Sequence, residues 1–372
     1  MIRSGISPAG DQAWIVDDYA TVKKLLADSR LSRFSHPDPP NAPRFTGSEI
    51  VGSPLHDISL DDLREQAIHE FISPFVKQSV TEKLIPAIES TADRFIVAAK
   101  DLPQPFDLIS SIAYPVPASV ISGIIGFPDH CHQKISRLAV LSGNIADSKV
   151  AEAASVQLCD LTIEIMEKDD TAGQHNIIGR VMQGVKDGYF ASFDLHQFAE
   201  MIKGVQIAGQ MNTANAIERG VMLMLQGGIE QDTILESTER MESLVEEVLR
   251  CPHPINRKQS GVPRYALHDV PMGSTVIQRG ELVILDTEGA NEDEKIFDCP
   301  AEFRPNRSPN PHMTFGYGRH FCVGAAMARL EVQIILRKIF QQMPGLRLVE
   351  QNFRKCEDQL AGGLETLYVT WG

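Results

Sequence analysis

Apolar residues recur every three or four positions over long stretches in the middle of the chain. This spacing places apolar side chains on one face of an α-helix, so it predicts a largely helical protein. The predicted helices cover residues 85–99, 156–166, 198–225 and 241–249. Proline and glycine gather instead at 35–55 and 252–273, which predicts irregular structure between the helical parts.

No internal repeat, low-complexity segment or linker divides the chain. A length of 372 residues with 43% hydrophobic content would suit one large domain or two ordinary ones. The most apolar stretch, residues 114–127, contains two prolines and is too short to span a bilayer, and no signal peptide is visible. We therefore expect a cytoplasmic protein.

Charge and cysteine usage narrow the possible partners and the compartment. The formal net charge is −14 and no run is rich in lysine or arginine, so we expect neither nucleic acid nor a membrane surface as a partner. The six cysteines show no paired or CxxC spacing, which fits a reducing compartment better than a disulfide framework.

Residues 315–324 read FGYGRHFCVG and lead directly into a helical pattern. The glycines let the backbone turn tightly and approach a flat cofactor closely. The first turn of the following helix points unpaired N–H groups toward the sulfur of Cys322, and such donors favour the thiolate form. The segment therefore predicts a cysteine thiolate that is presented to a metal.

These ten residues resemble the cysteine loop of the cytochromes P-450, the haem-thiolate monooxygenases. Upstream, residues 247–250 (EVLR) are similar to the E-x-x-R helix of that family. Residues 303–307 (FRPNR) are similar to the segment whose arginine completes the ion-pair network of that helix. Residues 14–28 and 264–293 also match, so the resemblance to the soluble bacterial type covers nearly the whole chain.

The resemblance implies the cytochrome P-450 fold, which is mainly α with a small β region. In this triangular, prism-like helical fold the haem lies between a long helix and the helix that follows the cysteine loop. Residues 1–372 are then expected to form a single domain, with its small β-rich region near residues 10–20 and 255–300.

The cofactor that the resemblance implies is haem b, iron protoporphyrin IX, with the Cys322 thiolate as the axial ligand of the iron. Phe315, Gly316 and Gly324 match the loop positions that surround the haem in the family. A thiolate pushes electron density onto the iron and favours cleavage of an O–O bond.

Several charged residues match positions that hold the cysteine loop in place. Glu247, Arg250 and Arg307 are expected to form this structural network. Arg329 and Glu331, on the helix after the loop, either belong to the same network or lie on a solvated helix face, and we favour the solvated face.

The two haem propionates need cationic or hydrogen-bonding partners. Arg264 and His320 match two positions that usually supply them. On the helix before residue 74, Glu65 and His69 stand where a histidine and an arginine are usual. Glu65 is not expected to bind a propionate, whereas His69 is expected either to bind one or to be a surface histidine.

Residues 207–217 resemble the helix that crosses the oxygen-binding face of the haem. The family usually reads A-G-x-(E/D)-T-T here, and Ala208 and Gly209 fix the register. Gln210 takes the variable position, Met211 the acid position and Asn212 the alcohol position. Because methionine donates no proton and an amide does not titrate usefully, we expect atypical proton delivery.

The resemblance implies an oxidoreductase that hydroxylates, epoxidises or oxidatively couples a medium-sized natural-product intermediate. Ordinary oxygenation would then draw protons from another water path or from the substrate itself. The loss of the acid and alcohol also allows peroxide-driven or oxygen-independent chemistry, such as coupling, isomerisation or dehydration. A haem protein that binds a ligand or partner without turnover is an alternative of another class.

No G-x-G-x-x-G motif follows a predicted strand, so electrons must come from a separate ferredoxin and its reductase unless the enzyme uses peroxide. The ferredoxin would dock near Arg304, Arg307 and Arg319. By family position the pocket is lined by residues 45–60, by 255–262 and by Val205, Gln206, Ala208, Gly209 and Asn212. A carrier-tethered or peptide substrate is equally compatible with this wall.

Overall fold

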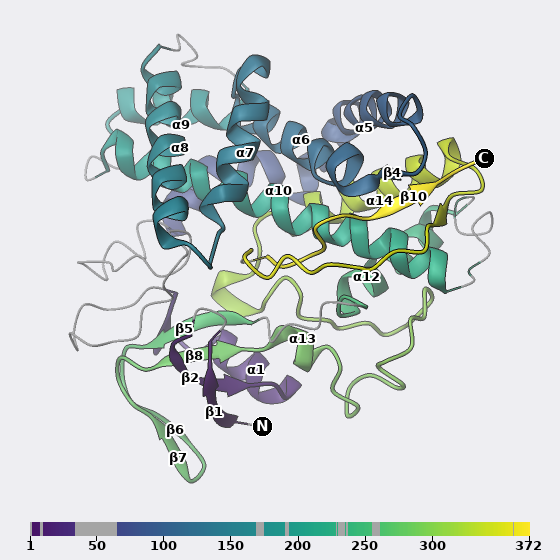
Figure 1. The fold of residues 1–372 in the computed structure, drawn as a ribbon. Coiled ribbons are helices and arrows are strands. Elements are labelled where there is room, and N and C mark those ends of the chain that lie inside the picture. Colours follow the sequence, from purple (N-terminus) through teal and green to yellow (C-terminus); the bar gives the residue numbers. More distant parts are fainter. Residues whose placement is uncertain are drawn as a thin grey trace.

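The structure is a computed structural model. It describes residues 2–7, 10–33, 65–168, 175–189, 193–227, 229, 235, 237–254, 261–359 and 361–372. Its long helices are α5 (Ile85–Lys100), α6 (Pro115–Ile125), α7 (His132–Ser142), α8 (Ser148–Lys168), α9 (Ile177–Lys186), α10 (Leu195–Gln226), α12 (Thr238–Arg250) and α14 (Ala325–Gln342). The prediction of a mainly helical protein with a small β region is confirmed (Figure 1).

Shorter helical segments connect these elements. The α-helical ones are α1 (Tyr19–Leu26), α3 (Ser73–Val76), α4 (Gln78–Thr81) and α13 (Thr287–Ala290). The others are η1 (Ile68–Ile72), η2 (Glu82–Leu84), η3 (Ile109–Ala113), η4 (Asp129–Cys131) and η5 (Gly318–His320).

Helix α10 is the central element of the helical part, where it packs against α6, α8, α12 and α14 (Figure 1). It is 32 residues long. A capping box starts it, in which the Asp194 carboxylate accepts from the Gln197 N–H at 2.8 Å and the Gln197 side chain accepts from the Asp194 N–H at 2.8 Å. This cap explains why the helix begins before its first regularly spaced apolar residue, Phe198.

The largest sheet has five strands in the order β1-β2-β8-β5-β3. These strands are β1 (Ile2–Ile6), β2 (Gln12–Val16), β8 (Leu282–Leu285), β5 (Val262–Ala266) and β3 (Leu31–Ser32). Among these described strands, β2 and β8 are the one parallel pair, with Trp14 opposite Val283. Figure 1 shows this sheet apart from the main helical layer, with α1 beside it.

Two smaller sheets complete the β structure. The first has the order β4-β10-β9, from β4 (Phe106–Asp107), β10 (Tyr368–Thr370) and β9 (Arg347–Leu348). The second is the hairpin of β6 (Val270–Met272) and β7 (Thr275–Ile277). None of the described helices is long and apolar enough to cross a membrane.

The apolar core has two main parts. The larger part fills the space between the long helices, where residues such as Ile202, Val248 and Ile335 are fully buried. The smaller part joins α1 to the five-stranded sheet through Val22, Leu25 and their neighbours. This second core fixes α1 beside the cysteine loop, since α1 contacts η5.

Candidate functional site

The cysteine loop is shaped by two glycines in left-handed conformations. Gly316 has a φ of +74° and Gly318 a φ of +76°, which residues with a side chain rarely adopt. A Cβ on Gly318 would also lie 3.1 Å from the Cα of Ala27 at the end of α1. These turns bring the Cys322 N–H to the Phe315 carbonyl at 3.0 Å and place Cys322 just before α14.

Cys322 is exposed, yet burial raises the pKa of its thiol above the ordinary value. The thiol is therefore accessible although much of its surroundings is protein. A hydrogen bond from the Gly324 N–H and the charges of Arg33 and Arg329 lower the pKa but do not fully offset burial. Of the N–H donors expected from sequence, that of Gly324 is present at the sulfur.

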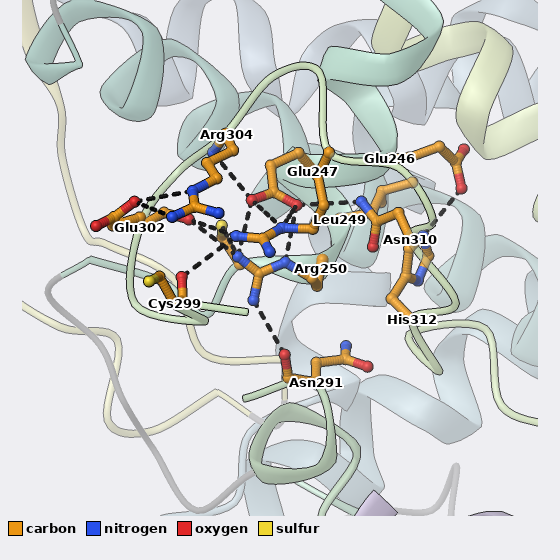
Figure 2. Close-up of polar contacts among 12 residues, drawn as sticks. Glu246, Glu247, Leu249, Arg250, Asn291, Cys299, Glu302, Arg304, Asn310 and His312 are labelled. Atoms are coloured by element: carbon orange, nitrogen blue, oxygen red, sulfur yellow. Dashed lines mark hydrogen bonds and ion pairs between the residues drawn. The ribbon is translucent and has the colours of Figure 1, made fainter. Parts of the chain in front are cut away.

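A buried ion-pair network lies behind this loop, centred on Glu247 of α12 (Figure 2). Arg250 donates to its two carboxylate oxygens through Nε and Nη2, both at 2.8 Å. Arg307 donates to both oxygens through Nε at 3.0 Å. The N–H of Arg304 and the Asn310 amide complete the set of donors, at 3.0 and 3.1 Å. The network expected from Glu247, Arg250 and Arg307 is confirmed.

The same arginines hold the segment that leads to the cysteine loop. Arg250 donates to the Asn291 carbonyl at 3.0 Å, as Figure 2 shows, and Arg307 donates to the Asp298 carbonyl at 2.7 Å. Although burial opposes ionisation, hydrogen bonds from Arg250 and Arg307 hold the pKa of Glu247 below its usual value. The carboxylate is therefore an anion whose charge is shared by two guanidinium groups.

A second network joins α12 to α14. Glu246 accepts from Arg329 Nε at 2.5 Å and Nη2 at 3.0 Å, and it pairs with His312 Nε2 at 3.0 Å. These contacts outweigh burial and lower the pKa of Glu246 to about 2. The interpretation of Arg329 as part of a solvated face is therefore wrong, because its head group is bound to α12.

Glu331 is also not on a solvated face. It is 1% exposed, and within the described part of the chain its Oε1 has no hydrogen-bond partner. Burial raises the pKa of this carboxyl well above its usual value. The favoured interpretation failed here because α14 packs against α5, α10 and α12 and thus buries more than one of its faces.

Ala208 and Asn212, one turn apart on α10, are exposed although most of this helix is buried. The Asn212 amide donates to the Ala208 carbonyl at 3.3 Å. Gly209 packs against α6, since a Cβ on it would lie 2.8 Å from Ile121 Cγ1. The accessible part of the proposed oxygen-binding segment thus consists of a methyl group and an amide.

Two glutamines of α10 take part in helix packing. Gln206 accepts from the Ser122 hydroxyl at 3.0 Å and donates to Gln210 at 3.2 Å. Gln210 in turn donates to the Ser136 hydroxyl at 2.8 Å. Both glutamines are fully buried, so this chain of hydrogen bonds ties α10 to α6 and α7.

Met211 turns toward the segment that follows α7. It is 2% exposed, and a Cβ on Gly143 would lie 3.1 Å from its methyl carbon and 3.3 Å from the Oε1 of Gln359. Asn215 lies one turn further along α10 and donates to the Ala361 carbonyl at 2.8 Å. The acid position of the family is thus occupied by an apolar group that packs near the residues before β10.

Glu218 continues this face of α10 and pairs with His253 at 2.6 Å, and both are buried. Glu218 also accepts from the Leu364 N–H at 3.3 Å. Residues 211, 215 and 218 are spaced by four and three positions, so their shared helix face could have been predicted from the sequence.

The two predicted propionate partners, Arg264 and His320, lie in different surroundings. Arg264 is buried in β5, where its Nη1 donates to the Pro263 carbonyl at 2.8 Å. His320 Nδ1 lies 2.6 Å from Glu65 Oε1, and that oxygen also accepts from Arg33 Nη1 at 3.2 Å. Glu65 rather than His69 therefore reaches the cysteine loop, and sequence patterns gave no reason to include Arg33.

His69 is exposed in η1 and forms no hydrogen bond or ion pair with any described residue. Two of the pocket segments that the family positions indicate, 45–60 and 255–260, lie outside the described residues.

Comparisons with known proteins agree with this site. The family model described as Cytochrome P-450 matches residues 229–345, which include α12, the cysteine loop and α14. A cytochrome P-450 of Mycobacterium marinum is 31% identical over 97% of this chain and 88% of its own length. Pentalenolactone synthase of Streptomyces exfoliatus is 27% identical over 98% of this chain and 92% of its own length.

The fold is shared with solved structures as well. The crystal structure of a mycinamicin VIII C21 methyl hydroxylase of Micromonospora griseorubida, bound to mycinamicin VIII, matches with a TM-score of 0.85. It is 25% identical, and the match covers 100% of this chain and 94% of the other. With these similarities along almost its entire length, the chain belongs to the cytochrome P-450 family of haem-thiolate monooxygenases.

Proposed function

We propose that the protein oxidises a medium-sized natural-product intermediate by hydroxylation, epoxidation or oxidative coupling, with Cys322 as the axial thiolate of its haem. The observation that carries the proposal is the position of Cys322, which is exposed just before α14 in a loop shaped by two glycines. The buried Glu247 network behind the loop supports a fixed position for this sulfur.

The residues around Cys322 fit a haem. A Cβ added to Gly324 would have the Cys322 sulfur as its nearest neighbour, at 4.0 Å. A Cβ added to Gly316 would have the His320 carbonyl oxygen as its nearest neighbour, at 3.7 Å. A planar group can therefore approach the loop closely. Arg264 and His320 supply charge and hydrogen-bond donors for two carboxylates.

A bound haem supplies the oxygen and electron-transfer chemistry. The protein residues hold and tune it. The Gly324 N–H stabilises negative charge on the Cys322 sulfur, and Arg329 adds a positive charge nearby. Because Arg329 is bound to Glu246, this charge stays at a fixed place beside the loop.

We propose that neither residue 211 nor residue 212 is itself the proton donor. Met211 is buried and has no proton to donate. The Asn212 amide donates to the Ala208 carbonyl, which leaves its Oδ1 to accept from a water or from a substrate hydroxyl. The proton would then come from that water or hydroxyl.

The substrate class is supported by relatives whose names indicate natural-product chemistry, pentalenolactone synthase and the mycinamicin hydroxylase. Ala208 and Asn212 offer a small apolar contact and one amide to such a substrate. A carrier-tethered or peptide substrate would use the same two groups.

A ferredoxin is proposed as the electron donor. Arg307 takes no part in its docking, because its side chain is 6% exposed and is bound to Glu247. Arg319 is exposed next to the cysteine loop, and Arg304 is partly exposed and pairs with Asp298 at 2.9 Å. These two arginines are the proposed contacts for an acidic partner.

Peroxide-driven or oxygen-independent chemistry is the second candidate. It is favoured by one observation, the burial of Met211 at the position where the family has a proton-donating acid. An enzyme of this kind would need no ferredoxin.

The test compares the ferrous carbon monoxide spectrum of the protein with that of Cys322→Ser and of Cys299→Ser, which removes a cysteine that is also exposed. We expect the thiolate-type band in the wild type and in Cys299→Ser and its loss in Cys322→Ser. Retention of the band in Cys322→Ser would refute the assignment. Product analysis with ferredoxin and O₂ against peroxide then separates the two candidate functions.

A further inference from the structure

A carboxylate stands beside the cysteine loop, near the place where the haem carboxylates are proposed to be held. Glu65 Oε1 lies 2.6 Å from His320 Nδ1 and 3.2 Å from Arg33 Nη1. His320 belongs to η5, two residues before Cys322, and Arg33 directly follows β3. Three distant segments of the chain therefore meet at one oxygen atom.

Glu65 is charged in this position. Its side chain is 15% exposed, and burial alone would raise its pKa. The hydrogen bond with His320 and the charges of Arg33 and Arg319 hold the pKa below its usual value instead. A partly buried anion close to two further carboxylates would repel them unless extra positive charge lay between them.

Arg33 provides that charge. A guanidinium has five N–H donors, and within the described part of the chain only Nη1 of Arg33 is used, for Glu65. The side chain is 38% exposed, so the remaining donors are accessible. The charge of Arg33 also lowers the pKa of the Cys322 thiol, in keeping with a position near the cysteine loop.

We propose that Arg33 binds a haem propionate and that Glu65 is a positioning residue, which anchors Arg33 and orients His320. This inference rests on the proposed function only in that a haem occupies the site. In this proposal Arg33 takes the role of the arginine that is usual in the family at position 69, where this chain has a histidine. Glu65 occupies the position of the usual histidine.

The arrangement also fixes the ring of His320. Because Nδ1 faces Glu65, Nε2 points away from it and is the ring nitrogen left for another partner. Glu65 thus sets the direction of two donors that come from opposite ends of the chain. If Glu65, Arg33 and His320 instead form only a structural ion-pair cluster, none of them contacts the cofactor.

The experiment measures the rate of haem transfer to apomyoglobin and the midpoint potential of Arg33→Ala, Glu65→Gln and the double variant. Arg30→Ala is the matched control, since Arg30 pairs with Asp28 at 2.6 Å and leaves the Glu65 cluster intact. Losing one charge-assisted hydrogen bond to a propionate should speed haem loss roughly tenfold in Arg33→Ala. We expect no change in Arg30→Ala.

The midpoint potentials add a second readout, because a loss of structure alone would not shift Arg33→Ala and Glu65→Gln in opposite directions. Removal of the Arg33 charge should lower the midpoint potential, and removal of the Glu65 charge should raise it. The increase in the rate of haem loss in the double variant should be smaller than the product of the two single increases, because part of the effect of Glu65 passes through Arg33. Thermal unfolding of each apoprotein checks that the fold is retained.

Equal haem loss and equal potentials in Arg33→Ala and Arg30→Ala would overturn the proposal. That result would leave the proposed function untouched as long as the wild type shows the thiolate-type spectrum. A wild type that binds no haem would refute the proposed function and, with it, this inference.

Discussion

The guanidinium carbon of Arg329 lies 4.5 Å from the centroid of the Phe315 ring. The same guanidinium is bound to Glu246 of α12, and the Phe315 carbonyl accepts the Cys322 N–H. One side chain of α14 therefore couples α12 to the cysteine loop, and the stacking contact adds a cation–π attraction to the ion pair.

Replacing Arg329 by Met should loosen the cysteine loop while the length of the side chain is kept. We expect a smaller fraction of the ferrous carbon monoxide complex to show the thiolate-type band, because the ring of Phe315 loses its partner and Cys322 loses a nearby charge. Arg337→Met is the control, since Arg337 forms no hydrogen bond or ion pair with the described residues of the chain. A full thiolate band in Arg329→Met would contradict the coupling.

Acid should unfold the protein partly through Glu246. Its pKa falls from 4.5 to about 2 in the folded state, so the stability that it contributes is present above pH 4.5. This stability is lost as the pH drops from 4.5 through about 2, where the carboxylate takes up a proton in the folded state. Urea unfolding of Glu246→Gln between these pH values should show a shallower pH dependence than the wild type. Parallel curves would show that Glu246 is not the group responsible.

The pair of Glu247 and Arg250 should contribute far more to stability than an exposed pair. Replacing Arg250 by Leu leaves a buried, partly unpaired carboxylate, which should cost about 3–5 kcal/mol. The exposed pair of Glu164 and Lys168 provides the comparison, and Lys168→Leu should change the free energy of unfolding far less. Equilibrium unfolding in urea measures both, and similar losses would contradict the structural role of Glu247.

Helical periodicity was enough to locate α5, α10 and α12, because each buries an apolar stripe along most of its length. The ends were less well predicted. Helix α12 begins at Thr238, three residues before the start predicted at 241. Ser237 caps the helix by accepting from the Arg240 N–H, and this cap rather than an apolar residue determines the first turn.

The contacts between distant segments were the part that the sequence did not reveal. Glu65 was not expected to bind a propionate, and the family pattern gave its position but not the cation beside it. Arg33 lies 32 residues earlier, next to a short strand that carries no chemical motif. Likewise, Glu331 has the composition of a surface residue, and only the packing of α14 on three helices shows that it is buried.

Gly318 should be more sensitive to substitution than a glycine in open space. Gly318→Ala combines an unfavourable φ of +76° with a Cβ that would lie 3.1 Å from Ala27. Gly188 has a φ of +75° with no atom within 4 Å of the added Cβ, so Gly188→Ala tests the backbone term alone. That term should cost about 1–2 kcal/mol, and Gly318→Ala should cost more and weaken haem binding. Equal losses of thermal stability would show that the contact with α1 is unimportant.

Restoring the acid and alcohol should fail to restore ordinary proton delivery. In Met211→Glu the carboxyl would replace a side chain that is 2% exposed, and it would lie close to the Oε1 of Gln359, which has no hydrogen-bond partner among the described residues. We expect the acid to stay protonated and to destabilise the protein by about 2 kcal/mol, whereas Met211→Leu should cost less than about 1.5 kcal/mol.

The double variant of Met211→Glu and Asn212→Thr should therefore form no more product with ferredoxin and O₂ than the wild type. A side chain at position 211 is buried and also points away from that of residue 212. It faces Gly143 and Gln359, whereas Asn212 is accessible. An acid at 211 would need to reach past its own helix to pass a proton to residue 212. A large gain in product would show that the side chain reorients and that the usual relay operates in this scaffold, which would remove the case for atypical proton delivery.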